Sequence, residues 1–444
     1  MRRLFFYLWI GFGFISLAAL GAAATGPATV AFVDVTVIPM DTERTLAGQT
    51  VIVKGDKIAE VGPVGTVKIP ADAQRIEGKG KFLIPGLGEL HGHNPPLGSS
   101  PQYFEDVFFL FVANGVTTVR SMQGFPGQLE WREKARRGEI VAPTLYLAGP
   151  SFNGQSVPTP QSAIARVRDQ KAEGWDLLKI HPGIKPEVYA ALAQTAKDVG
   201  IEFSGHIPAD VGLVACIKHG QRTVDHLDGY IEHLAAKDGP IDRAKLAEIV
   251  KFTRETGTWV VPTMALWEVI LGGVRAEDVA AYPELKYMPR PVIESWRKGY
   301  TSRLANPNFN AAQVKRIIEN RNVLLKALHD GGVRIVFGTD APQQYSVPGF
   351  SIHRELAAMK AVGMSNFAVL QTATKNVGDY YKDREAFGTV TTGQRADLVL
   401  LQANPLDDLG HVAKRSGVMV RGRWLAEADI QARLEKIAAA AAAK

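Results

Sequence analysis

The chain of 444 residues has a single cysteine, Cys216, so it cannot form an internal disulfide. It also has no basic run with interleaved aromatic residues, and its formal net charge is only +6, so nucleic acid is not an expected partner. No Gly-x-Gly-x-x-Gly turn opens a helix, which argues against a dinucleotide-binding sheet. Hydrophobic residues make up 46% of the chain and charged residues 22%. This composition predicts a globular protein with a large core, stabilised by packing or metal and not by disulfides.

The N-terminus has the composition of a secretory signal. Arg2 and Arg3 precede the apolar stretch "LFFYLWIGFGFISLAALGAAA", which ends in small residues at 22–24. This order predicts a signal peptide over 1–24 and an exported protein, either periplasmic or secreted. The apolar run over 4–20 is close to membrane-spanning length, so an uncleaved membrane anchor is the alternative. Glycines interrupt the run and no basic cluster follows it, so we expect cleavage and no stable membrane span afterwards.

Short β-like runs occur at both ends of the remaining chain. They are "VAFVDVTVIP" and "TVIVKGDKIAEVG" near the N-terminus, and "FGTVTTGQRADLVLLQANP" and "VMVRGRWL" near the C-terminus. Alternating apolar residues with Gly-Asp turns predict antiparallel strands. We expect residues 28–85 and 386–430 to form one small, discontinuous β-sandwich domain. The Ala-rich residues 431–444 favour a helical tail.

Between these ends, strand-like apolar runs alternate with helical stretches. In chain order, the runs are "FLIPGLGELHGH", "GVTTVRSM", "TLYLAGPSF", "WDLLKIHP", "IEFSGHIP", "TVDHLDGY", "TWVVPTMAL" and "VRIVFGTDAP". Eight βα units over 86–385 predict an α/β protein with a distorted (β/α)8 TIM-type barrel, whose chemistry lies at the carboxyl ends of the strands. An aromatic-containing insertion at about 266–313 is expected to be a pocket lid, a homo-oligomer contact or a helical excursion with its own core.

Residue types that bind metals or move protons stand where these predicted strands end. They are His91, His93, Lys179, His206, His226 and Asp340. Taken singly, a histidine at a strand end is more often a structural residue, a lysine is an ion-pair partner and an aspartate caps a helix. Because a barrel gathers the ends of its strands into one bowl, the shared position of the six favours a joint metal site.

The residue types of this cluster suit a divalent ion such as zinc. Three or four imidazole and carboxylate ligands leave an open position for a water, whose pKa the metal lowers towards neutrality. A cationic lysine is a poor ligand. Lys179 carboxylated by carbon dioxide would instead be an anion able to bridge two ions.

These motifs resemble the metal-dependent amidohydrolase superfamily, specifically its imidazolonepropionase-like and Xaa-Pro dipeptidase-like branch. The resemblance covers nearly the whole chain after the signal. It rests on "IPGLGELHGH", "LLKIHPG", "SGHIP", "TVDHLDG", "FGTDAP" and the tail "GTVTTGQRADLVLLQANPLDDL". One departure is Glu89, which stands where many relatives carry an aspartate two residues before the first histidine. That position is not a ligand, so the metal assignment is unaffected.

The resemblance implies a centre of two divalent ions, for which zinc is the expected metal. As ligands it implies His91 and His93 for the buried ion, His206 and His226 for the outer ion, and N-carboxylated Lys179 as the bridge. Asp340 would contact the metal and the bridging hydroxide, and would be the catalytic residue. Its role would be to accept the proton of the hydroxide and pass it to the leaving amine.

Three further residues are expected to contact the substrate. Tyr230 would hold the oxyanion, with packing as the alternative role; His181 would lie on the same face as Lys179; and Arg120 would receive a carboxylate. The predicted reaction is hydrolysis of the amide bond of a dipeptide or N-acyl amino acid. One alternative is a one-metal cyclic amidohydrolase or deaminase with unmodified Lys179. The other is an exported, non-catalytic binding protein on a retired barrel, which the complete set of ligand positions disfavours.

Overall fold

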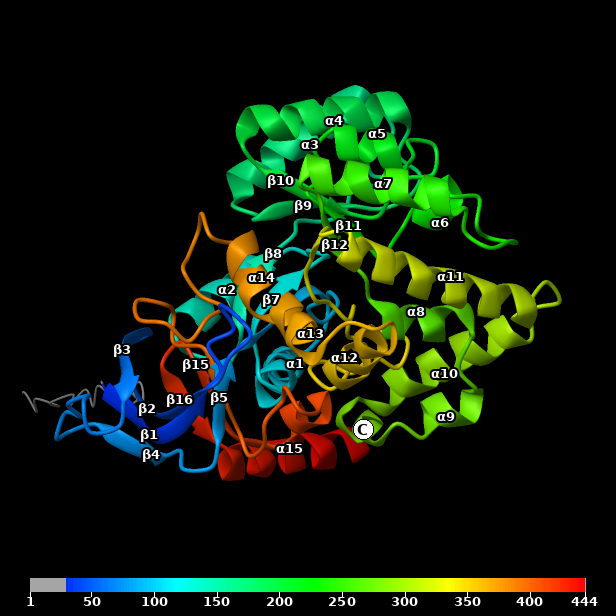
Figure 1. Ribbon diagram of the computed structural model, residues 1–444. Helices are drawn as coiled ribbons and strands as arrows, with labels where there is room; N and C mark the ends of the chain where they lie inside the picture. Colours follow the sequence, from blue (N-terminus) through cyan, green and yellow to red (C-terminus); the bar gives the residue numbers. More distant parts are fainter. Residues whose placement is uncertain (1–28, 444) are drawn as a thin grey trace, which may run out of the picture.

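The computed structural model describes residues 29–443. The predicted signal peptide, 1–24, lies outside these residues. Figure 1 shows a sheet built from both ends of the described chain beside a larger region of short strands and helices. Within 29–443, no helix combines the length and apolar character needed to cross a bilayer.

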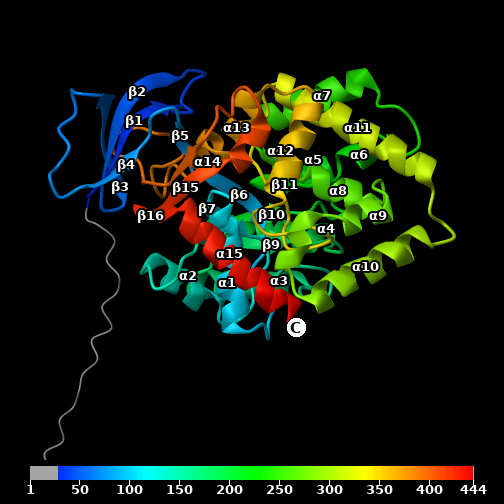
Figure 2. The same ribbon diagram turned by 90° about the horizontal axis from the view of Figure 1, so that it is seen from below.

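Both ends of the described chain contribute to one mixed, eight-stranded sheet, with the order β16-β15-β14-β5-β1-β2-β3 and with β4 paired to β1. Its strands are β1 (Thr29–Val37), β2 (Leu46–Lys54), β3 (Lys57–Pro63), β4 (Gln74–Glu77), β5 (Phe82–Pro85), β14 (Leu398–Leu401), β15 (Arg415–Val420) and β16 (Arg423–Ala426). The ends meet where β14 pairs antiparallel with β5, with Leu398 opposite Pro85. Figure 2 shows this neighbourhood of N-terminal and C-terminal strands.

The strand pairing in this sheet does not confirm the predicted β-sandwich. Strand β1 is hydrogen-bonded to β2 along one edge and to β4 and β5 along the other. Because β1 is bonded on both edges, hydrogen bonds connect the strands from the two ends into one sheet, and the predicted β-sandwich is not confirmed. Apolar residues of alternating position, such as Phe32, Val51 and Leu400, form its core, and Trp424 packs edge-on against Phe32.

All eight strands predicted for the central region form, and they run parallel in the expected order. They are β6 (Leu87–Gly92), β7 (Val116–Ser121), β8 (Thr144–Leu147), β9 (Leu177–Ile180), β10 (Glu202–Gly205), β11 (Thr223–Asp225), β12 (Trp259–Val261) and β13 (Arg334–Ile335). Their pairing gives a three-stranded sheet, β6-β7-β8, and a five-stranded sheet, β13-β12-β11-β10-β9.

Bridges and backbone hydrogen bonds outside the regular ladders join these two sheets at both junctions. At one junction, Ala148 bridges to Leu177 in parallel orientation. At the other, the Leu90 N–H donates to the Phe337 carbonyl at 2.8 Å. Since β13 is two residues long and the chain beyond it is not a regular strand, no continuous ladder closes the circle. The fold is therefore α/β with parallel and mixed sheets, and the strand pairing does not by itself close the predicted distorted (β/α)8 barrel.

Helices follow the central strands and supply the outer layer; in Figure 1, α3, α4 and α7 lie on one side of the strands β9 to β12. The helices up to the insertion are α1 (Pro101–Ala113), α2 (Gln128–Arg136), α3 (Pro160–Glu173), α4 (Pro186–Val199), α5 (Leu213–Lys218), α6 (Tyr230–His233) and α7 (Arg243–Thr256). Local sequence explains their limits. Thr159 and Ser162 form a capping box at the start of α3, and Gly174 ends that helix in the left-handed conformation.

The insertion at 266–313 is helical and packs against the chain that follows Asp340. The remaining helices are α8 (Met264–Leu271), α9 (Ala276–Ala280), η1 (Pro283–Tyr287), α10 (Arg290–Leu304), α11 (Ala311–Asp330), α12 (Ile352–Ala361), α13 (Asn366–Ala373), α14 (Lys375–Tyr380), η2 (Leu409–Ala413) and α15 (Glu427–Ala442). The α10 residues Trp296 and Tyr300 each lie 5.9 Å from the ring of Tyr345. The predicted tail, 431–444, falls largely within α15.

Candidate metal centre

Strand β6 and the chain after β13 are bonded to each other at the carboxyl ends of the parallel strands. The Asp340 N–H donates to the His91 carbonyl at 2.6 Å, and the His93 N–H donates to the Ala341 carbonyl at 2.8 Å. Gly338 permits this approach, because a Cβ there would lie 2.9 Å from the His91 nitrogen. This close pairing brings Asp340 beside two histidines that precede it by about 250 positions in sequence.

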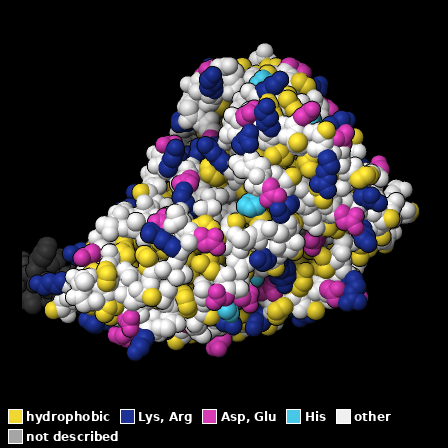
Figure 3. All heavy atoms as spheres, in the orientation of Figure 1, with side chains coloured by type: hydrophobic (Ala, Val, Ile, Leu, Met, Phe, Trp, Pro, Cys, Tyr) yellow, Lys and Arg dark blue, Asp and Glu magenta, His cyan; other side chains and the backbone are white. Residues whose placement is uncertain are grey.

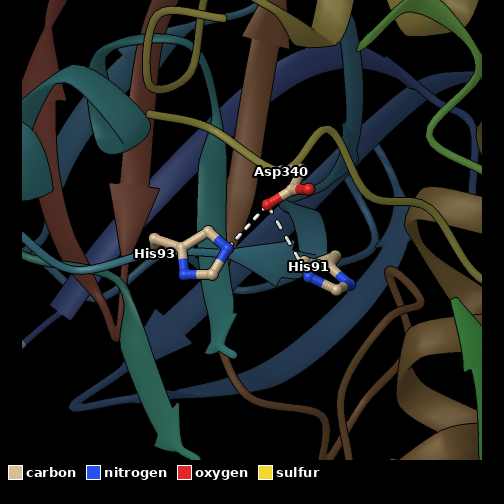
Figure 4. A group of neighbouring side chains, drawn as sticks. All are labelled: His91, His93 and Asp340. Carbon is tan, nitrogen blue, oxygen red and sulfur yellow. Dashed lines mark hydrogen bonds and ion pairs between the residues drawn. The ribbon is translucent and has the colours of Figure 1, made fainter. Parts of the chain in front are cut away.

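His91, His93 and Asp340 form a compact donor set. His93 Nε2 lies 2.6 Å from Asp340 Oδ1, and His91 Nε2 lies 3.6 Å from the same oxygen. One ligand atom from each of the three residues lies within 4.8 Å of the others, and Figure 4 shows both imidazoles directed at this carboxylate. Two imidazole nitrogens and a carboxylate oxygen at this spacing suit a divalent ion such as zinc.

The other three predicted ligands lie around this set. Lys179 is fully buried, and its Nζ lies 3.0 Å from His91 Nε2. His226 Nε2 lies 3.7 Å from Asp340 Oδ2, and the His206 ring centre lies 4.8 Å from that of His226. The structure thus brings all six predicted ligands together, although they come from five different strand ends.

Burial disfavours the charged forms of His91, His226 and Lys179. It lowers the pKa of His91 and His226 well below the usual value of histidine, and neighbouring cationic groups add to the effect. Burial also lowers the pKa of Lys179 to about 8. His226 donates or accepts through Nδ1 with Thr263 at 2.8 Å, whereas its buried Nε2 has no hydrogen-bond partner. A neutral imidazole with an unpartnered nitrogen facing a carboxylate fits a metal ligand, because the ion would take up that lone pair.

The three predicted substrate residues lie in different surroundings. His181 is partly exposed beside the cluster, with its ring stacked 5.0 Å from that of His206, and burial lowers its pKa to about 3. Arg120 is fully buried and contacts Leu90, Tyr380, Thr223 and Asp225, so the predicted contact with a substrate carboxylate is not supported. Tyr230 is also buried, and its hydroxyl lies 2.9 Å from Thr253 Oγ1, which matches the packing alternative and not an oxyanion contact.

Several polar residues that support the cluster were not among the predicted site residues. Glu89 is fully buried and accepts hydrogen bonds from the His91 and Thr339 N–H groups at 3.0 and 2.8 Å. Asp225 and Asp228 flank His226 in sequence, yet they contact His91 and His206 respectively, each at 2.7 Å. The sequence signal that could have found such residues is a charged side chain within an apolar strand, because a buried charge needs a partner. The partner itself is not readable from the sequence.

Glu355 supports the cluster from α12. Its fully buried carboxylate accepts hydrogen bonds from the Met264 and Ala265 N–H groups at 2.9 and 2.8 Å, at the start of α8 and directly after Thr263. Burial raises the pKa of Glu355 from 4.5 to about 7; the two backbone N–H groups and Arg321 oppose this shift, while Glu268 adds to it. The folded protein therefore binds this proton more tightly than the unfolded chain does.

We expect Glu355→Gln to remove a pH dependence of stability. The stabilisation from the protonated carboxyl is complete below pH 4.5 and is lost as the pH rises through about 7. Relative to the variant, the wild-type free energy of unfolding should fall by about 2–3 kcal/mol between pH 5 and pH 8. Urea titrations across that range measure it, with the exposed Glu255→Gln as the control. A constant difference between wild type and Glu355→Gln would contradict the assignment.

The arrangement of fold and donors defines a class of protein. Imidazoles, a carboxylate and a buried lysine gathered at the carboxyl ends of parallel strands are typical of metal-dependent hydrolases. On the face seen in Figure 3, basic and acidic side chains are interspersed.

Comparison with known proteins gives the family. Residues 82–425 match the amidohydrolase family, so the chain belongs to that family. This confirms the resemblance inferred from the sequence motifs.

Solved structures share the fold at low sequence identity. A Bottromycin amidohydrolase superposes with a TM-score of 0.72 at 24% identity, covering 94% of this chain and 91% of that chain. A putative prolidase from Bifidobacterium longum gives 0.71 at 20%, covering 93% and 99%. A Xaa-Pro dipeptidase with methionine in its active site gives 0.67 at 19%, covering 90% and 100%. At these identities the similarity concerns the fold.

One curated protein also matches this chain at low sequence identity. An adenine deaminase from Rubrobacter xylanophilus is 22% identical over 437 residues, which cover 92% of this chain. The match covers 61% of the deaminase, so this chain corresponds to only part of that relative's length.

Proposed function

We propose that the protein is an exported hydrolase that uses two divalent ions, with zinc as the metal, to cleave the amide bond of a dipeptide or N-acyl amino acid. The observation that carries this proposal is the meeting of His91, His93 and Asp340 within 4.8 Å, with Lys179, His206 and His226 around them. The two sheets of the central region are proposed to act as one distorted barrel that collects these side chains.

The six side chains fit the two-ion arrangement. His91 and His93 would hold the buried ion, His206 and His226 the outer one, and N-carboxylated Lys179 would bridge them. The unpartnered His226 Nε2 and the close approach of Lys179 Nζ to His91 support this division. When bound, the ions would supply an activated water and polarise the scissile carbonyl.

Asp340 is placed to move the proton of the reaction. One of its oxygens lies 2.6 Å from His93 Nε2, while the other faces His226. The carboxylate would accept a proton from the attacking water as the carbon–oxygen bond forms. It would then donate that proton to the leaving nitrogen as the carbon–nitrogen bond breaks. Partly exposed His93 and His206 leave this side of the cluster open to a substrate, and His181 beside them is proposed to contact it.

A one-metal enzyme that opens a cyclic amide or deaminates a ring is the second candidate. It is favoured by the fact that the donor set within 4.8 Å contains only His91, His93 and Asp340, which is sufficient for one ion. The match to an adenine deaminase supports the same class. Lys179 would then be an unmodified amine.

Metal analysis and a substrate panel decide between these candidates. Protein lacking residues 1–24 is loaded with Zn²⁺, and the ions per chain are counted. It is then assayed with dipeptides, N-acyl amino acids, cyclic amides, lactones and adenine. We expect about two ions per chain and turnover of a linear amide. About one ion with turnover of a ring would establish the second candidate, and failure to hydrolyse any linear amide would reject the dipeptidase proposal.

A further inference from the structure

A chain of buried polar groups runs from the donor set into the interior of the strands. His91 Nδ1, on the side of the ring away from Asp340, lies 2.7 Å from Asp225 Oδ2. Both side chains are at most 1% exposed. Asp225 is in turn contacted by the guanidinium of Arg120, at 3.3 Å from Oδ2, and by the Thr223 hydroxyl, at 2.5 Å from Oδ1. Three strands contribute one member each to a His91–Asp225–Arg120 series: the paired strands β6 and β7 supply His91 and Arg120, and β11 of the other central sheet supplies Asp225.

Arg120 is held from several directions, so it is a rigid support for Asp225. Its Nε donates to the Leu90 carbonyl at 2.6 Å, directly beside His91. Its Nη1 donates to the Tyr380 hydroxyl at 3.1 Å, and the Tyr380 hydroxyl donates to Glu202 Oε1 at 2.9 Å. Leaving the Asp225 carboxylate buried without this cation would be costly. The role of Arg120 is thus internal, which explains why the predicted contact with substrate is not supported.

We propose that Asp225 is a positioning residue for His91, with Arg120 holding Asp225 in place; the inference rests on the proposed metal function. A carboxylate at Nδ1 places the ring proton on that nitrogen and leaves the Nε2 lone pair free for an ion. In this structure the Nδ1 contact is close but is not aligned as a hydrogen bond. A small rotation of the imidazole as Nε2 takes up the ion would align it.

The inference predicts a specific loss of metal affinity. Asp225→Asn retains the size of the side chain but removes its charge, and we expect the dissociation constant for Zn²⁺ to rise about 10–100-fold. Competition with a chromophoric chelator measures it without reference to activity. The visible spectrum of the Co²⁺-loaded protein should shift as well, because the orientation of His91 changes. Asp397→Asn is the matched control, since Asp397 is also a buried carboxylate paired with an arginine, Arg395.

Arg120→Lys tests the same inference if Asp225→Asn does not fold. Lysine retains the charge but not the fork that reaches Leu90, Tyr380 and Asp225, so the affinity for Zn²⁺ should also fall, by a smaller factor. Unchanged affinity and an unchanged Co²⁺ spectrum in the folded variants would overturn the positioning role and leave the proposed function intact. Failure of the wild-type protein to retain Zn²⁺ would overturn the proposed function itself.

Discussion

Asp340→Asn is expected to lower kcat by about 10²–10⁴-fold while the protein stays folded. The amide retains the shape of the carboxylate but cannot accept the proton of the attacking water, so the proton has no route to the leaving nitrogen. Asp340 also lies between two imidazoles, with oxygens 2.6 Å from His93 Nε2 and 3.7 Å from His226 Nε2. Loss of its charge should therefore weaken metal binding as well as proton transfer.

Measurements at saturating Zn²⁺ separate these two effects. Steady-state kinetics with the best substrate of the panel give kcat, and circular dichroism reports the fold. Asp330→Asn is the control, because Asp330 is an exposed residue of α11 that pairs only with Lys326 on the same helix. Activity of Asp340→Asn within a few-fold of wild type, with bound metal, would rule out Asp340 as the proton carrier. If the wild type were itself inactive on every substrate of the panel, the binding-protein alternative would remain.

Arg395→Met is expected to lower the free energy of unfolding by about 3–5 kcal/mol. Arg395 lies shortly before β14, and its side chain is fully buried. It pairs with Asp397 at 2.6 Å and with Glu385 at 2.5 Å. Methionine fills much of the space but leaves these carboxylates without their shared cation. Glu385 retains Arg421 at 2.9 Å, so the larger penalty falls on Asp397.

Urea unfolding of single and double variants tests this assignment. Arg395→Met combined with Asp397→Asn should be more stable than Arg395→Met alone, since the second change removes the unpaired charge. Arg275→Met provides the surface comparison, because Arg275 is 71% exposed and solvent screens its pair with Asp278. Equal stability of Arg395→Met and Arg275→Met would show that the buried network contributes nothing.

The positions of the strands were predictable from local pattern. Each of the eight central runs is a short apolar segment bounded by turn residues, and each became a strand. How strands pair with one another, and whether a sheet closes into a barrel, depends on contacts between residues far apart in the sequence. The two chain ends were expected to form a sandwich, but β1 accepts partners on both edges and joins them into one sheet. Similarly, the central strands form two ladders, because β8 and β9 are joined, within 29–443, only by bridges and hydrogen bonds outside the strands, and because β13 is only two residues long.

The six candidate metal ligands could be identified from the sequence alone, because histidines, a lysine and an aspartate at the ends of successive strands have few other uses when they occur together. The roles of Arg120, Glu89 and Asp225 were decided only by the tertiary structure. Each lies in an apolar run whose sequence shows that a buried charge needs a partner, but partners are supplied by other strands, more than 100 positions away for Arg120 and Asp225. The chemical type of a ligand is a property of a single residue. Charge compensation and side-chain orientation depend on distances between residues, which are set only when the chain folds.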